Sequence, residues 1–133
     1  MRVVLDTNVR ISGVFFGGLP RRILEAWRDG ALRIVLSPEI LKEYQRVGDR
    51  LAQRYSGVDL NPFLQLLGRH GELISAPELE EQITKDPDDE KFFACAHAAR
   101  VTVIVPGDDD LVQASPWDGI EVLRPAEFCS RFL

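Results

Sequence analysis

Near its N-terminus the chain reads Val3-Val4-Leu5-Asp6-Thr7-Asn8, a short apolar run that ends at a carboxylate. The β-branched residues and the abrupt polar stop predict a buried strand followed directly by Asp6. In open parallel sheets, ligands bind in the crevice outside the carboxyl ends of the strands. Asp6 is therefore well placed for chemistry, provided that other functional groups reach the same edge.

The rest of the chain alternates between strand and helix patterns. Strands are predicted at 33–36, 73–74, 102–105 and 120–123, and helices begin at 20, 38, 61, 86 and 111, with a last turn or helix from 125. Strands separated by helices indicate an α/β domain with a mainly parallel sheet of four to five strands. Its 133 residues fit a single domain, 1–133.

The helix that begins at Pro38 has the clearest pattern. Its apolar residues recur every three or four positions and predict one stripe that faces the core: Ile40, Tyr44, Val47, Leu51 and Tyr55. Glu43 lies about 60° to the side of Ile40, at the margin of that stripe. An acid in this position is near the edge of the sheet that Asp6 occupies.

Composition narrows the class of protein. No apolar run approaches the roughly 18 residues that cross a bilayer, so we expect a cytoplasmic protein without a membrane span or export signal. The net charge of −5 argues against a general nucleic-acid coat protein but not against a nucleic-acid enzyme. Cys95 and Cys129 lie on apolar helix faces, which favours burial as small hydrophobes over a disulfide or a metal pair.

Several acids are predicted to reach one edge of the sheet. Asp6 and Asp108 each follow a strand, and in a parallel sheet both lie at the carboxyl edge. Asp86 and Asp89 open the helix that leads into the strand at 102–105. Glu43 lies about one and a half turns into the helix that leaves the second strand.

Each acid also has an ordinary structural explanation. Asp86-Pro87-Asp88-Asp89 is a good helix cap, and taken alone this interpretation is the favoured one. Asp108-Asp109-Asp110 can form a turn or cap, and Glu43 can pair with Arg46 or Arg50 across helix turns. Asp6 is harder to explain in this way, because a carboxylate at the end of a buried strand is costly to desolvate.

Taken together, the acids favour metal chemistry. Converging carboxylates repel one another unless cations neutralise them, and oxygen ligands suit one or two Mg²⁺ or Mn²⁺ ions. Two such ions activate water and hold a phosphate, so phosphodiester hydrolysis is the natural reaction class. A zinc site is disfavoured because His70 and His97 lack ligand spacing. The chain has no G-x-S-x-G, Walker or G-x-G-x-x-G motif, and a receiver-like domain would need a late strand-end lysine that 100–105 does not supply.

At this point the chain resembles the PIN-domain family, in particular its branch of toxin components of toxin–antitoxin pairs. Four motifs carry the resemblance in the correct order: Leu5-Asp6-Thr7-Asn8-Val9, Leu36-Ser37-Pro38-Glu39-Ile40-Leu41-Lys42-Glu43, Asp86-Pro87-Asp88-Asp89-Glu90-Lys91-Phe92 and Gly107-Asp108-Asp109-Asp110-Leu111. The resemblance implies a three-layer α/β/α sandwich and a Mg²⁺- or Mn²⁺-dependent ribonuclease that cuts single-stranded RNA. It also implies a cognate antitoxin as partner, and dimers are common in such proteins.

Carried over by position, the resemblance implies a catalytic quartet of Asp6, Glu43, Asp89 and Asp108. Asp6, Asp89 and Asp108 would bind metal, and Glu43 would be a further ligand or would orient the attacking water. Supporting roles fall to neighbouring polar residues: Asn8, Asp86 and Asp110. Arginines near the same edge are candidates for phosphate contact, with solvated surface residues as the alternative: Arg10, Arg21 and Arg22.

One position departs from the family pattern. Pro106 stands where a Thr or Ser is common, and it offers neither a hydroxyl nor a backbone N–H. A hydrogen bond that positions a ligand or phosphate is therefore expected to be missing. The alternative function is a catalytically degenerate PIN-like α/β binding module whose acidic groove binds a basic segment of a partner protein.

Overall fold

The central β-sheet has five strands in the order β3-β2-β1-β4-β5, and each neighbouring pair is parallel. In this computed structural model, which describes residues 1–6, 18–55, 57, 61–107 and 109–133, the strands are β1 (Arg2–Leu5), β2 (Arg33–Leu36), β3 (Glu72–Leu73), β4 (Val103–Val105) and β5 (Glu121–Val122). The predicted parallel sheet of four to five strands is confirmed. The first strand lies at the centre, so the residue that follows it emerges at the middle of the carboxyl edge.

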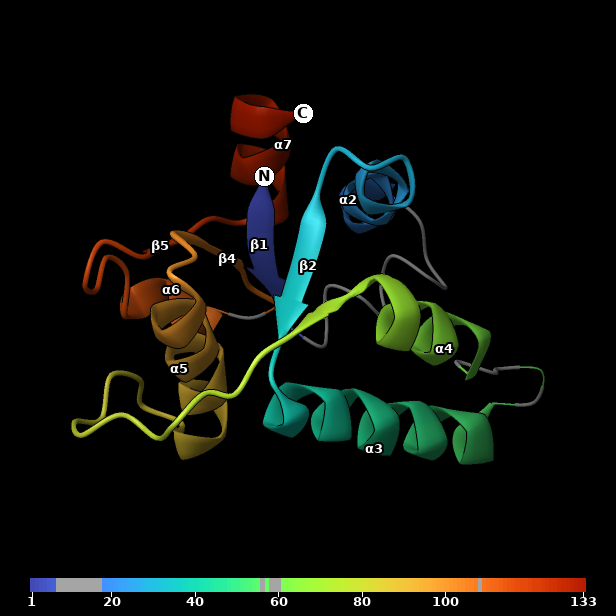
Figure 1. Cartoon of the computed structure of the whole chain (residues 1–133), viewed down its shortest axis with the longest axis horizontal. Helices are drawn as coiled ribbons and strands as arrows, with labels where there is room; N and C mark the ends of the chain where they lie inside the picture. The colour runs from blue at the N-terminus through green and yellow to red at the C-terminus, as the bar shows by residue number, and fades with distance from the viewer. Residues whose placement is uncertain (7–17, 56, 58–60, 108) are drawn as a thin grey trace.

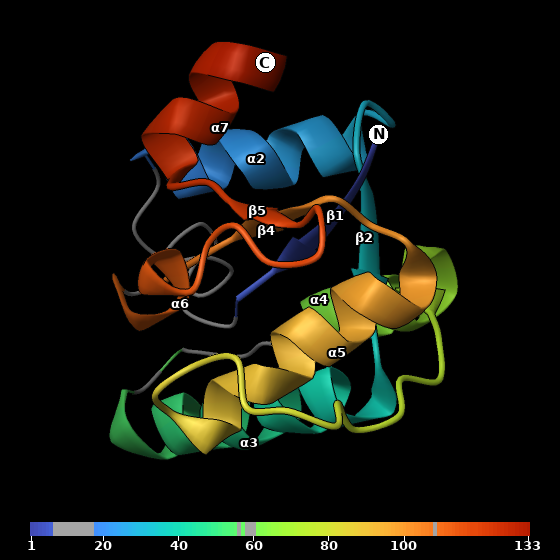
Figure 2. The same ribbon diagram turned by 90° about the vertical axis from the view of Figure 1, so that its left-hand side faces the viewer.

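Helices cover both faces of the sheet and form the predicted three layers. On one face α2 (Gly18–Arg28) packs against α7 (Pro125–Phe132), and on the other α3 (Pro38–Arg54) packs against α5 (Glu90–Ala99), as Figure 2 shows. The remaining helices are α4 (Asn61–His70), the 3₁₀ helix η1 (Pro87–Asp89) and α6 (Asp109–Gln113). Within the described ranges, no helix combines the length and apolarity that a membrane span requires.

The core lies between the sheet and these helices. The β1 side chains Val3, Val4 and Leu5 are fully buried, and α5 contributes Phe92 and Phe93. Burial of each such side chain stabilises the fold by about 1.5–3 kcal/mol.

Both cysteines are free and buried, as the sequence predicted. Burial raises the pKa of the Cys95 thiol to about 12, with Glu39 as the next cause. A thiol with so high a pKa is neutral at physiological pH, so Cys95 behaves as a small core residue and not as a nucleophile.

Helix α3 begins where the sequence predicted, but the apolar stripe along it is buried only in its first part. The Ser37 hydroxyl oxygen accepts a hydrogen bond from the Ile40 N–H at 3.3 Å, and Pro38 occupies the first helical position. Ile40 and Tyr44 are buried, whereas Tyr55 is 53% exposed, so the prediction that the whole stripe faces the core was wrong at its end. Figure 1 shows that α3 continues beyond the sheet, so its last turns do not lie over the strands.

A side-chain bridge ties β1 to the outer strand β3 across β2. The Arg2 guanidinium donates from Nε to Glu72 Oε2 at 2.9 Å and from Nη2 to Oε1 at 2.8 Å. Its Nη1 donates to the Ala99 carbonyl at 2.7 Å, at the end of α5. These three bonds fix the amino edge of the sheet to the helix below it.

Arg2→Met is therefore expected to lower the free energy of unfolding by about 1 kcal/mol at pH 7. The hydrogen bond from Arg2 lowers the pKa of Glu72 from its ordinary 4.5. A depressed folded-state pKa contributes stability above the unfolded value and loses it as the pH falls through the folded value. The difference between Arg2→Met and the parent in urea unfolding should shrink as the pH drops below 4.5. A pH-independent difference would assign the effect to the Ala99 carbonyl alone.

Candidate active site at the carboxyl edge of the sheet

Asp6 lies at the carboxyl end of β1 and is 4% exposed. Its backbone N–H donates to the Val105 carbonyl at 3.0 Å, which extends the pairing of β1 with β4. Its Oδ2 accepts the N–H of Gly107 at 2.8 Å. The two strand ends that the sequence placed at one edge are thus joined through the Asp6 carboxylate itself.

The 3₁₀ helix η1 separates the roles of Asp86 and Asp89. Asp86 caps η1, because its Oδ1 accepts the Asp88 N–H and its carbonyl accepts the Asp89 N–H, both at 3.0 Å. Asp89 stands at the N-cap position of α5 but forms no side-chain cap hydrogen bond, and it is 8% exposed. The capping explanation therefore holds for Asp86 and fails for Asp89. A buried carboxylate that does not cap its helix requires another reason for its position.

The connection before η1 is anchored to the start of α5. Glu90 Oε1 accepts the N–H of Ile83 at 2.5 Å and that of Thr84 at 3.3 Å. The Thr84 hydroxyl donates to the Asp86 carbonyl at 2.5 Å, and Thr84 is buried. The inner end of this connection, at 83–84, is therefore held against α5. Its backbone bonds to Glu90 hold η1 against α5 and so fix the position of Asp89.

Glu43 is engaged by a residue that sequence reasoning did not single out. Lys91 Nζ lies 2.7 Å from Glu43 Oε1, and the two side chains are only 17% and 14% exposed. Arg46, the partner expected from helix spacing, is 3.8 Å away. Lys91 also donates to the Asp88 carbonyl at 2.7 Å. The lysine therefore links α3 to the segment that carries Asp89. In the sequence, only its position two residues after Asp89 indicated that it could lie near the site.

Tyr44 docks α3 onto the end of β1. Its hydroxyl donates a hydrogen bond to the carbonyl of Leu5, the residue before Asp6, and its ring is buried. Because Tyr44 follows Glu43 directly, this contact keeps the Glu43 turn of α3 close to the carboxyl edge. The helical register predicted from the sequence is confirmed at this point.

Of the other predicted site residues, some lie at the surface and some fall outside the residues that the structure describes. Asp86 and Asp110 are exposed, the latter in the first turn of α6. Arg21 pairs with Glu25 at 3.5 Å, and Arg22 is close enough to Cys129 of α7 to affect its pKa. His70 and His97 are exposed. Three further predictions fall on residues that the structure does not describe: Asn8, Arg10 and Asp108.

Burial distinguishes two of the predicted metal ligands from every other described charged residue. Among the charged residues whose side chains the structure describes, Asp6 and Asp89 alone are buried, at 4% and 8% exposure. Carboxylate oxygens are the ligands that Mg²⁺ and Mn²⁺ prefer, so this donor set fits such an ion. The described residues contain no group of three acids, histidines or cysteines close enough to hold a metal, and the predicted third ligand, Asp108, is outside them.

Comparisons with known proteins agree with this geometry. The family model of the PIN domain matches residues 2–110. The uncharacterized protein MJ1680 of Methanocaldococcus jannaschii is 32% identical over 117 residues, which span 84% of this chain and 74% of that relative. The match covers β1, η1 and β4, which carry or contact the acids described above. The chain therefore belongs to the PIN domain family, whose members are generally nucleases that use divalent metal ions.

Proposed function

We propose that this protein is an endoribonuclease that hydrolyses phosphodiester bonds of single-stranded RNA with Mg²⁺ or Mn²⁺. The observation that carries the proposal is the burial of Asp6 and Asp89, at 4% and 8% exposure. Burying two carboxylates costs free energy, and a positive charge nearby is the usual way in which proteins offset that cost. A bound divalent cation compensates for that cost and gives the acids a function.

The proposed metal ligands are Asp6, Asp89 and Asp108. One or two divalent ions held there would supply Lewis-acid activation of water and charge neutralisation at the phosphate. The Gly107 N–H orients the Asp6 carboxylate, so the residue after Pro106 supplies a backbone donor although Pro106 has none. Asp86 acts indirectly by capping η1 and so positions Asp89.

Glu43 is proposed to orient the attacking water beside these metal ligands. Its carboxylate is held by Lys91 at 2.7 Å, which fixes its orientation near the carboxyl edge. A carboxylate oriented in this way accepts a hydrogen bond from water and can align it for attack on a phosphate. Lys91 is thus a positioning residue for Glu43.

The test is cleavage of a mixed-sequence single-stranded RNA by the purified chain. Cleavage is expected with Mn²⁺ or Mg²⁺, none in EDTA, and recovery when Mn²⁺ is added back in excess. A matched DNA of the same sequence tests the preference for RNA. Cleavage that persists in EDTA would contradict the metal-dependent mechanism.

PIN domains often belong to toxin–antitoxin systems, and we propose that this cytoplasmic protein is the toxin component, held by a cognate antitoxin and able to form a homodimer. Induced expression should then arrest growth, and expression of the Asp6→Asn variant should not. If the chain cuts no RNA and binds no Mn²⁺ in a titration, it is instead a degenerate module whose acidic groove binds a partner protein.

A further inference from the structure

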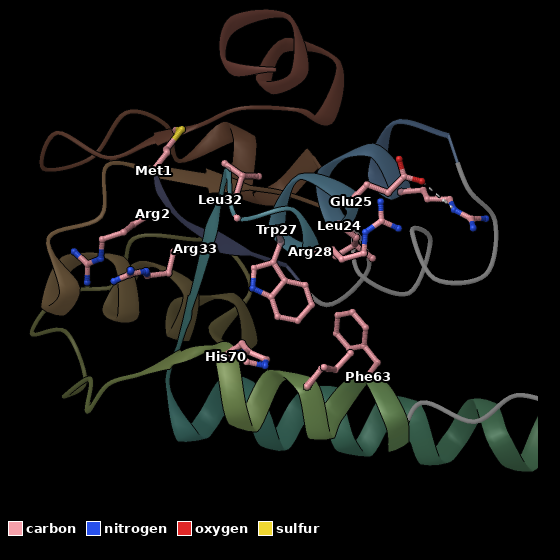
Figure 3. A pocket seen from close by; sticks show the side chains of 13 residues that line it. Met1, Arg2, Leu24, Glu25, Trp27, Arg28, Leu32, Arg33, Phe63 and His70 are labelled. Atoms are coloured by element: carbon pink, nitrogen blue, oxygen red, sulfur yellow. Dashed lines mark ion pairs between the residues drawn. The ribbon is translucent and has the colours of Figure 1, made fainter.

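A cavity lies at the amino end of β1 and β2, away from Asp6. It has a volume of about 770 Å³ and lies between α2, α4 and the starts of β1 and β2, as Figure 3 shows. Arg2 and Arg33 at its wall are the first residues of β1 and β2, whereas Asp6 follows the last residue of β1. At 3.3 Å per residue, the strand separates the two regions by about 13 Å. The cavity is therefore distinct from the candidate active site.

The floor of this cavity is aromatic and aliphatic. Trp27 of α2 and Phe63 of α4 lie with ring centroids 5.4 Å apart and an interplanar angle of 51°, and Figure 3 shows both rings facing the space between the helices. Met1 and Leu66, which also line it, are 46% and 47% exposed. Large apolar side chains kept accessible beside a cavity of this size are typical of a ligand site.

Basic side chains surround the aromatic floor. Arg21 and Arg28 line the cavity and are paired on the surface with Glu25 at 3.5 Å and Asp29 at 3.1 Å. Arg33 and His70 line it as well, and within the described part of the chain neither forms an ion pair or a side-chain hydrogen bond. The other three arginines of the lining are paired with acids, so the excess positive charge beside the cavity lies at Arg33. The local field therefore attracts anions.

We propose that this cavity is an exosite that binds one or two nucleotides of single-stranded RNA. A base stacks against the accessible face of Trp27, and the neighbouring phosphate contacts Arg33 and Arg28. A nucleotide presents a flat π surface and an anionic group close together, which the lining matches. An acidic peptide side chain offers the charge without the π surface and is the less suitable ligand.

The exosite rests on the proposed function, because it would hold the strand whose cleavage occurs at the carboxyl edge. An RNA strand must run over the surface between the two places, a longer path than the ~13 Å along the buried strand β1, so an oligonucleotide is needed to reach both. The site predicts that RNA long enough to occupy both regions binds more tightly than a dinucleotide. Binding is measured in EDTA, so its outcome does not depend on hydrolysis.

Tryptophan fluorescence gives the direct test. Trp117→Phe leaves Trp27 as the single tryptophan, because the chain contains two. Titration of this variant with an oligouridylate of about 10 nucleotides in EDTA should quench Trp27 emission to saturation. Arg33→Glu should weaken the affinity about tenfold, measured also by the anisotropy of labelled oligouridylate with the otherwise unchanged chain.

The matched control is Arg50→Glu, which makes the same change in net charge at an exposed α3 position outside the cavity lining. It should bind oligouridylate within about twofold of the parent. Equal losses in the two variants, or no quenching of Trp27, would overturn the exosite. Quenching by an acidic peptide but not by RNA would also overturn it. Absence of cleavage with intact Trp27 quenching would instead contradict only the proposed hydrolysis.

Discussion

Asp6→Asn is expected to reduce RNA cleavage in Mn²⁺ by a factor on the order of 100 or more, with the fold unchanged. The amide oxygen of Asn can still accept the Gly107 N–H, which now binds Asp6 Oδ2 at 2.8 Å. What the variant loses is the negative charge that would hold a divalent cation. Initial rates on labelled single-stranded RNA measure the loss, and far-UV circular dichroism verifies the fold.

The control for this variant is Asp88→Asn, which removes one carboxylate charge from the same Asp-rich segment. Asp88 is exposed, whereas Asp89 beside it is buried. Asp88→Asn should cut RNA within about threefold of the parent, since an exposed carboxylate contributes little to a buried site. If Asp6→Asn cleaves as fast as Asp88→Asn, Asp6 is not a metal ligand and the site assignment is wrong.

Lys91→Met is expected to lower the free energy of unfolding by about 2 kcal/mol. The substitution removes the ammonium group that lies 2.7 Å from the Glu43 carboxylate, which is 14% exposed. The Arg46 guanidinium, at 3.8 Å, is a more distant partner. It also removes the hydrogen bond to the Asp88 carbonyl at 2.7 Å, which helps to hold η1. Urea unfolding at neutral pH measures the change.

Lys42→Met serves as the matched control, because Lys42 is an exposed lysine one position before Glu43 on α3. It should alter the free energy of unfolding by no more than about 0.5 kcal/mol. In the double variant Glu43→Gln with Lys91→Met, much of the loss should be recovered, because the carboxylate that Lys91 neutralised is then uncharged. Additive losses in the double variant would show that the Lys91 ammonium and Glu43 carboxylate do not depend on each other.

The positions of β1 and β2 could be predicted from the sequence, because each contains a short apolar run that ends at a polar residue. Val3-Val4-Leu5-Asp6 and Arg33-Ile34-Val35-Leu36 both carry this pattern, and both became strands at the predicted positions. Local periodicity could not show where a helix loses its packing partner. For that reason the stripe on α3 was predicted to reach Tyr55, which the structure leaves exposed.

The sequence by itself determined the α/β class, the parallel order of elements and the set of candidate acids, because these follow from local pattern and chain order. Only the tertiary structure decided which acids are buried: Asp86 caps η1 at the surface, whereas Asp89 turns inward. It alone brought Lys91 to Glu43 and formed the cavity beside Trp27. The physical reason is that burial and ion pairing depend on contacts between residues far apart in the chain, and no local pattern encodes such contacts.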